Sequence, residues 1–290
     1  MKMRALANTG IELSCVGLGE MPLSLSTRPN EAQAISVVHA AVDAGMTWID
    51  TADVYCAGHR DIGHGERLVT TALKAMGDSG KDIVVATKGG LERPGGNWTV
   101  NGHPDHLHSA CAASLRSLET DCITWYQLHA TDPKVHFTES VGALARLQEE
   151  GKIQHVGLSN VGVAEIQAAR EIVNVVSVQN RCNPFDRDSF NSGVVAFCTR
   201  ENIAFLPHSP VGGHKGHIRT PEDSVLCAVG ARHGISPYQV CIAWLLALSP
   251  MMLPIPGASR IESARSSAAA AATSLTQRDM EDLARAFPTV

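Results

Sequence analysis

The chain alternates short apolar strand patterns with helical stripes of Leu, Val and Ala. Parallel strands need helical crossovers, and a closed sheet leaves no exposed edge. The alternation therefore predicts a (β/α)8 TIM barrel, with a doubly wound open sheet as the alternative. The eight expected strands cover residues 16–18, 47–49, 83–87, 123–128, 153–158, 175–178, 203–206 and 252–255.

Both ends of the chain are expected to add an element to this barrel. Residues 4–7 and 12–15 flank Asn8-Thr9-Gly10, a hairpin turn because Asn and Gly tolerate positive φ. Residues 276–287 are typical of a closing C-terminal helix capped by Thr276. At 290 residues and 44% hydrophobic content, the chain can bury one large core. We expect residues 1–290 to form a single barrel domain.

Charge and apolar runs exclude several classes of protein. The net charge is -5 without a run of five like charges, so neither a basic nucleic-acid surface nor a disordered charged tail is expected. The longest apolar segment, residues 240–248, is too short to span a bilayer, and the N-terminus lacks the apolar run of a signal peptide. These observations indicate a cytoplasmic protein without a membrane partner. Its oligomeric state is left open.

Neither the cysteines nor the histidines form a metal-binding pattern. The eight cysteines include no Cys-x-x-Cys pair, so free thiols are expected. The closely spaced histidines lack the spacing of a His-Glu-x-x-His site, and no metal is expected. They are His103, His106 and His108, and His214 and His217.

Four polar residues follow the ends of three successive predicted strands. Asp50 and Tyr55 come just after the strand at residues 47–49, a stretch that by itself is typical of an ordinary turn. Lys88 and His129 end the next two strands. Because the C-terminal ends of barrel strands meet at one mouth, these side chains are expected to converge.

The four side chains together suit the reduction of a carbonyl group. A Tyr hydroxyl has a pKa of about 10, but an ammonium group stabilises its phenolate and a carboxylate can hold that ammonium in place. Tyr55, Lys88 and Asp50 supply these three groups. With His129 orienting the carbonyl oxygen, Tyr55 becomes a general acid. No side chain donates hydride, so a nicotinamide cofactor is required.

Other residues near the expected mouth suit such a cofactor. Ser159, Asn160 and Gln179 can hydrogen-bond a carboxamide. The helix expected to begin near Ser259 presents backbone N–H groups to a phosphate, and Arg260 favours the extra ribose phosphate of NADPH over NADH. A Rossmann site is not expected because no Gly-x-Gly-x-x-Gly follows a strand.

Six ordered motifs spread over nearly the whole chain resemble those of the aldo-keto reductases. They are Asp-Thr-Ala-Asp-Val-Tyr at 50–55, Ala-Thr-Lys at 86–88, Gln-Leu-His at 127–129, Val-Gly-Leu-Ser-Asn at 156–160, Val-Gln-Asn at 178–180 and Ile-Pro-Gly-Ala-Ser-Arg at 255–260. The resemblance implies a barrel plugged by its hairpin and a catalytic tetrad of Asp50, Tyr55, Lys88 and His129. It also implies extended NADPH, with its carboxamide at Ser159, Asn160 and Gln179 and its 2′-phosphate near Ser259 and Arg260. Gly257 is a further cofactor-binding candidate in the same motif.

Three positions depart from the family pattern. His208, in Pro207-His208-Ser209-Pro210-Val211, stands where many relatives stack an aromatic residue on the nicotinamide, and its imidazole offers a smaller stacking area. Cys56 replaces a Gly after the Tyr, and Ser267 replaces a late Asn that often contacts the adenine. We therefore expect cofactor affinity, rather than proton transfer, to differ.

The resemblance implies reduction of a small aldehyde or ketone. Two alternatives are an NAD(P)+-linked dehydrogenase of a sugar or pyridoxine-like alcohol and, more remotely, a cofactor-sensing regulatory subunit like the potassium-channel β subunits. Trp98 lies in a long loop, residues 89–102, and is a candidate substrate wall. No charged anchor for an acid or a phosphate is evident in the specificity loops at 89–102, 130–137 and 211–220.

Overall fold

Seven parallel strands form the central sheet of the computed structural model, which describes residues 1–289 apart from the side chains at positions 214 and 215. The strands lie in the order β11-β10-β9-β8-β5-β4-β3. Their bounds are β3 (Leu18–Gly19), β4 (Trp48–Asp50), β5 (Val84–Gly89), β8 (Ile123–Leu128), β9 (Ile153–Ser159), β10 (Val175–Arg181) and β11 (Ala204–His208). Each connection between successive strands of this sheet contains a helix, as parallel pairing requires.

The segment at residues 252–257 closes the sheet without being a regular strand. Isolated parallel bridges join Met252 and Ile255 to β11, and Gly257 to β3. Pro254 and Pro256 have no backbone N–H, so an uninterrupted ladder cannot form here. The predicted (β/α)8 barrel is therefore confirmed, but its eighth strand, expected at residues 252–255, is reduced to bridges.

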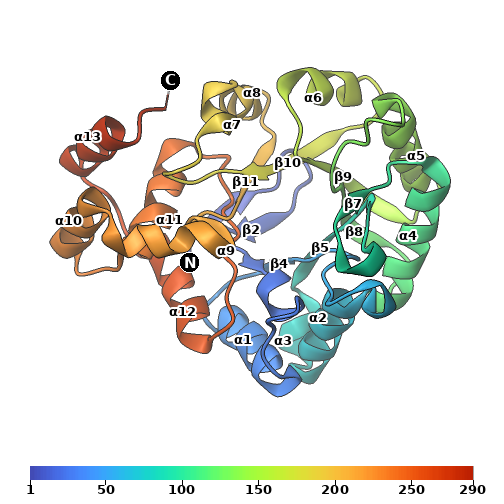
Figure 1. Cartoon of the computed structure of the whole chain (residues 1–290), viewed down its shortest axis with the longest axis horizontal. Helices are drawn as coiled ribbons and strands as arrows, with labels where there is room; N and C mark the ends of the chain where they lie inside the picture. The colour runs from blue at the N-terminus through green and yellow to red at the C-terminus, as the bar shows by residue number, and fades with distance from the viewer. Residues whose placement is uncertain (290) are drawn as a thin grey trace.

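The helices surround the strands (Figure 1). Residues 188–200 form two short helices, α7 (Asp188–Asn191) and α8 (Val194–Arg200), rather than one, because Gly193 adopts a φ of 77° between them. The helices are α1 (Glu31–Asp43), α2 (His64–Ala75), α3 (Asp78–Lys81), α4 (Pro104–Leu118), α5 (Phe137–Glu149), α6 (Val163–Arg170), α7 (Asp188–Asn191), α8 (Val194–Arg200), α9 (Gly213–Gly216), α10 (Ser224–His233), α11 (Pro237–Leu248), α12 (Ile261–Ala269) and α13 (Gln277–Ala286). No helix within residues 1–289 has the length and apolar character needed to cross a membrane.

Local sequence signals set several of these helix boundaries. The Asn30 side chain accepts a hydrogen bond from the Gln33 N–H and caps α1. Thr276 caps α13 in a reciprocal box with Asp279, which confirms the predicted closing helix. These caps satisfy N–H groups that a helix start leaves without an intrahelical partner.

The N-terminal hairpin plugs the barrel. Strands β1 (Met3–Ala5) and β2 (Glu12–Ser14) are antiparallel, and Gly10 in the connecting turn has a φ of 81°. Fully buried Leu6 and Leu13 belong to an apolar cluster with Trp48 and Trp125, whose rings lie 5.5 Å apart. The predicted hairpin and its position are thus confirmed.

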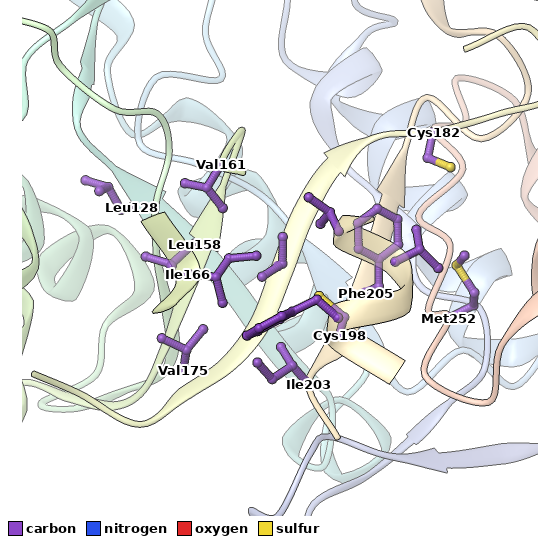
Figure 2. Close-up of a cluster of buried hydrophobic side chains, with 14 of the residues drawn as sticks. Leu128, Leu158, Val161, Ile166, Val175, Cys182, Cys198, Ile203, Phe205 and Met252 are labelled. Atoms are coloured by element: carbon purple, nitrogen blue, oxygen red, sulfur yellow. The ribbon is translucent and has the colours of Figure 1, made fainter. Parts of the chain in front are cut away.

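An apolar layer between strands and helices holds the barrel wall together. Figure 2 shows part of it, in which side chains from the strands meet others from the covering helices. Each large side chain buried there contributes about 1.5–3 kcal/mol relative to exposure. The labelled residues are Leu128, Leu158, Val161, Ile166, Val175, Cys182, Cys198, Ile203, Phe205 and Met252. All eight cysteines are free, as predicted.

The loop after β5 carries structure of its own. Its strands β6 (Leu91–Glu92) and β7 (Thr99–Val100) pair antiparallel, and a single 3-10 turn, η3 (Pro94–Gly96), lies between them. This hairpin, residues 91–100, supports Trp98 beside the C-terminal ends of the barrel strands, where the site residues gather.

Candidate active site

The structure brings Asp50, Tyr55 and Lys88 together at the C-terminal ends of β4 and β5. The Lys88 ammonium donates hydrogen bonds to Asp50 Oδ2 at 2.6 Å and to Tyr55 Oη at 3.1 Å. It also donates to the backbone oxygen of Thr51 at 2.8 Å. Three acceptors thus fix all three N–H groups of the ammonium. The convergence predicted from the strand ends is present.

Two glutamines complete the surroundings of the Asp50 carboxylate. Oδ1 of Asp50 accepts hydrogen bonds from Gln179 at 2.7 Å and from Gln127 at 3.1 Å. Asp50 and Lys88 are 2% and 0% exposed, so water does not screen their attraction. Burial by itself lowers the Lys88 pKa, but the Asp50 charge and the contact with Tyr55 raise it by more. The Lys88 pKa therefore lies above its ordinary value. Lys88 is a fixed cation at neutral pH.

Tyr55 retains its proton in this site. Burial raises the pKa of its hydroxyl, and the opposing effect of the Lys88 charge does not cancel that rise. The sequence indicates only the ammonium, which lowers the Tyr55 pKa, because burial of this position is not visible in it. A neutral phenol beside a fixed ammonium is an acid that has a proton to give.

His129 follows β8 and faces Tyr55. The two rings meet edge to face, with centroids 5.8 Å apart. Burial and the Lys88 charge lower the His129 pKa well below its usual value, so the imidazole is neutral at neutral pH and carries one N–H. Its Nδ1 is buried and has no hydrogen-bond partner within residues 1–289.

The three residues expected to hold a carboxamide lie at the ends of β9 and β10. The amide nitrogen of Asn160 donates to the His129 backbone oxygen and to Ser159 Oγ, both at 3.0 Å. The amide nitrogen of Gln179 is committed to Asp50 and to Gln127 Oε1, at 2.7 and 3.3 Å. Gln179 therefore also positions the Asp50 carboxylate, a contact that the sequence did not indicate.

The residues expected to hold a phosphate surround the start of α12. Arg260 is the N-cap of this helix rather than a first-turn residue, and no side chain caps it. Gly257, Ser259 and Arg260 are all exposed. The first N–H groups of α12 are therefore open to an anion.

His208 ends β11 at the same mouth. Its side chain is half-buried, and Nδ1 lies 3.3 Å from Ser209 Oγ. Burial, with the charges of Lys88 and Arg181, lowers its pKa to about 4. The ring is therefore a neutral flat surface at physiological pH.

Trp98 reaches Tyr55 from the β6–β7 hairpin. The indole is 45% exposed and meets the phenol ring edge to face, with centroids 6.3 Å apart. The predicted substrate wall therefore stands against the proposed acid.

Sequence reasoning missed Glu20, which directly follows β3. Glu20 is 0% exposed and accepts hydrogen bonds from Ser24 and, at 2.9 Å, from Thr51. Burial raises its pKa to about 7, although both hydroxyl groups and the Lys88 charge oppose the rise. The rule that found Asp50 and Lys88, a polar residue at a strand end, also points to Glu20.

Within residues 1–289, no three His, Cys, Asp or Glu side chains gather in a way that could hold a metal ion.

Comparisons with known proteins agree with this geometry. The model of the Aldo/keto reductase family matches residues 15–287. A probable aldo-keto reductase 1 of Glycine max is 30% identical, and the match covers 98% of this chain and 88% of the relative. An uncharacterized oxidoreductase of Schizosaccharomyces pombe is 34% identical, and the match covers 85% of this chain and 78% of the relative.

Solved structures share the fold. The thermostable aldo-keto reductase Tm1743, in complex with the inhibitor epalrestat, has a TM-score of 0.82 at 26% identity, covering 99% of this chain and 100% of its own. A Klebsiella pneumoniae aldo/keto reductase in complex with NADP and acetate has a TM-score of 0.83 at 24% identity, covering 100% and 97%. With the family match over almost its whole length, this chain belongs to the aldo/keto reductase family of oxidoreductases.

Proposed function

We propose that the protein is an NADPH-dependent reductase of aldehydes or ketones, with Tyr55 as the proton donor. The observation that carries the proposal is the Lys88 ammonium, held 2.6 Å from Asp50 and 3.1 Å from Tyr55 Oη in a buried site. Family membership supports it, as does the NADP in the related Klebsiella structure.

Each member of the tetrad has one task in this reaction. Tyr55 gives its proton to the carbonyl oxygen, and the ammonium of Lys88 stabilises the phenolate that forms. Asp50 keeps Lys88 charged and in place. The neutral ring of His129 donates a hydrogen bond that orients the carbonyl oxygen, which lies near Tyr55 Oη. When bound, NADPH supplies the hydride that reduces the carbonyl carbon, so the product is an alcohol.

The polar groups at the mouth fit a nicotinamide cofactor. Oε1 of Gln179 makes no hydrogen bond within the described chain and is available to a carboxamide, whereas its nitrogen is engaged with Asp50. Ser159 and Asn160 lie beside it. His208 provides a neutral ring for stacking, and the uncapped start of α12 with Arg260 suits the ribose phosphate.

The Tyr55→Phe variant tests the assigned acid. It removes only the hydroxyl group, so NADPH should still bind while kcat for reduction falls by about 10²–10⁴-fold. Cofactor absorbance during turnover of a panel of aldehydes, sugars, pyridoxal and ketones measures the loss, and fluorescence titration measures binding. Turnover within a few-fold of the wild type would remove Tyr55 from this role.

The Arg260→Ala variant tests the phosphate site. A charge-assisted contact is worth about 1.5–3 kcal/mol, so the Kd for NADPH should rise about 10–100-fold, and the Kd for NADH much less. Arg278→Ala, at an exposed position on α13, is the matched control. Equal weakening of both cofactors shows that Arg260 does not read the phosphate.

A further inference from the structure

Arg93 is a buried guanidinium whose hydrogen-bonding groups are largely unused. It lies in the β6–β7 hairpin and is 7% exposed. Its Nε and Nη1 are buried and have no acceptor in the described part of the chain. A buried charge normally requires a partner, because desolvation of an unpaired ion is costly. The natural partner of a guanidinium is an anion.

The nearby acidic residues are engaged elsewhere. Glu92, next to Arg93 in the chain, accepts a hydrogen bond from Asn101 at 2.8 Å and lies 3.5 Å from His106. Asp61, in the loop that follows Tyr55, pairs with Arg28 at 2.6 Å. Neither carboxylate serves as an internal partner for Arg93.

The guanidinium is connected to Tyr55 through Trp98. Its Cζ is 3.9 Å from the Trp98 ring, over which it stacks, and Trp98 in turn lies 6.3 Å from the Tyr55 ring. These two distances place the guanidinium carbon within about 10 Å of the Tyr55 ring. Burial raises the pKa of the Cys56 thiol, next to Tyr55, and the Arg93 charge opposes that rise.

The hairpin holds Arg93 in place before any ligand binds. The 3-10 turn after it is fixed by hydrogen bonds from Gly96 N to Arg93 O at 3.1 Å and from Asn97 N to Pro94 O at 3.0 Å. The base of the hairpin is joined by Asn101 N to Gly90 O at 3.0 Å. A side chain already ordered in this way loses little conformational entropy on binding.

We propose that Arg93, stacked on Trp98, is an anion subsite that binds the carboxylate of the carbonyl substrate. The permanent charge of the guanidinium attracts a carboxylate, and the indole offers a flat face to the carbon skeleton between the reacting groups. The substrate class is then an aldehyde or ketone with a carboxylate about one aromatic ring away from the carbonyl. This assignment rests on the proposed reductase function and narrows it.

A pair of aldehydes of nearly equal shape tests the subsite. 4-Carboxybenzaldehyde and 4-nitrobenzaldehyde both carry a planar group with two oxygens, but only the first is an anion. The quantity measured is the ratio of their kcat/KM values, so an effect common to both substrates cancels. Arg93→Met should lower the carboxy-to-nitro ratio at least about tenfold, as expected for the loss of a charge-assisted contact. Arg93→Lys should restore part of it.

The matched control is Arg116→Met, which removes the same charge from an exposed position on α4 and should leave the ratio unchanged. An unchanged ratio in Arg93→Met overturns the subsite. An equal fall for both aldehydes also overturns it, because Arg93 then only positions Trp98.

A binding measurement separates failure of the subsite from failure of the reductase function. Trp98 is the exposed tryptophan, while Trp48, Trp125 and Trp244 are buried, so ligand binding at the hairpin is visible in tryptophan fluorescence. Titration with 4-(hydroxymethyl)benzoate, the alcohol product, should give a Kd that rises at least about tenfold in Arg93→Met. If neither aldehyde is reduced, the proposed function fails and this titration alone decides the subsite. Equal binding to wild type and Arg93→Met refutes it.

Discussion

Ionisation of Glu20 should make the protein less stable as the pH rises towards neutrality. The carboxyl group is fully buried, and its pKa is raised to about 7 from 4.5, chiefly by burial. Between these two values the folded state holds a proton that the unfolded state has released. The contribution of Glu20 to stability should therefore be greatest below pH 4.5 and be lost as the pH rises through 7. At about 1.36 kcal/mol for each pKa unit, the loss is about 3 kcal/mol.

The Glu20→Gln variant removes this ionisation while keeping the shape of the side chain. Both hydroxyl groups beside it, on Ser24 and Thr51, can rotate to suit an amide. Urea denaturation at 25 °C from pH 4.5 to 8 should show the free energy of unfolding of the wild type falling by about 3 kcal/mol relative to the variant.

The control for this experiment is Glu149→Gln, at an exposed position on α5, whose pH dependence should parallel that of the wild type. The reasoning is refuted if the stability curves of wild type and Glu20→Gln run parallel over the whole range. It is also refuted if the variant becomes relatively less stable as the pH rises.

Two further substitutions probe the packing of the same site. Lys88→Met leaves Asp50 buried without its cation and should lower the free energy of unfolding by about 3–5 kcal/mol. The double variant Lys88→Met with Asp50→Asn should recover part of this loss. Equal stability of Lys88→Met and the wild type contradicts this expectation. Gly65→Ala should destabilise by about 1–3 kcal/mol in urea, because its new Cβ would lie 2.4 Å from a Glu20 carboxylate oxygen. Gly142→Ala in α5 has nothing within 4 Å and should instead stabilise by about 0.5–1 kcal/mol, so similar effects at both glycines refute the steric argument.

Features with a local cause were predictable. The period of apolar residues gave the order of strands and helices, and Asn30 and Thr276 marked two helix starts through caps that act within three residues. Barrel geometry then placed Asp50 and Lys88 at one mouth, because strand ends meet there. The eighth strand, expected at residues 252–255, is present only as isolated parallel bridges, because prolines interrupt its hydrogen bonding.

Features that depend on distant segments were not predictable. Gln179 lies 129 residues from Asp50 in the chain, and its hydrogen bond to Oδ1 exists only because the barrel closes. The raised pKa of Tyr55 likewise reflects burial by several elements.

Arg93 shows most clearly the difference between sequence and tertiary structure. From the sequence, its loop was expected to offer no charged anchor for an acid or a phosphate. The folded hairpin instead buries Arg93 over Trp98 and leaves its Nε and Nη1 without an acceptor among the described residues. The sequence by itself determined the barrel and the reacting groups, through local periodicity and the meeting of strand ends. Tertiary packing alone decided which charges are desolvated and which remain unpaired, because both properties depend on neighbours remote in the chain.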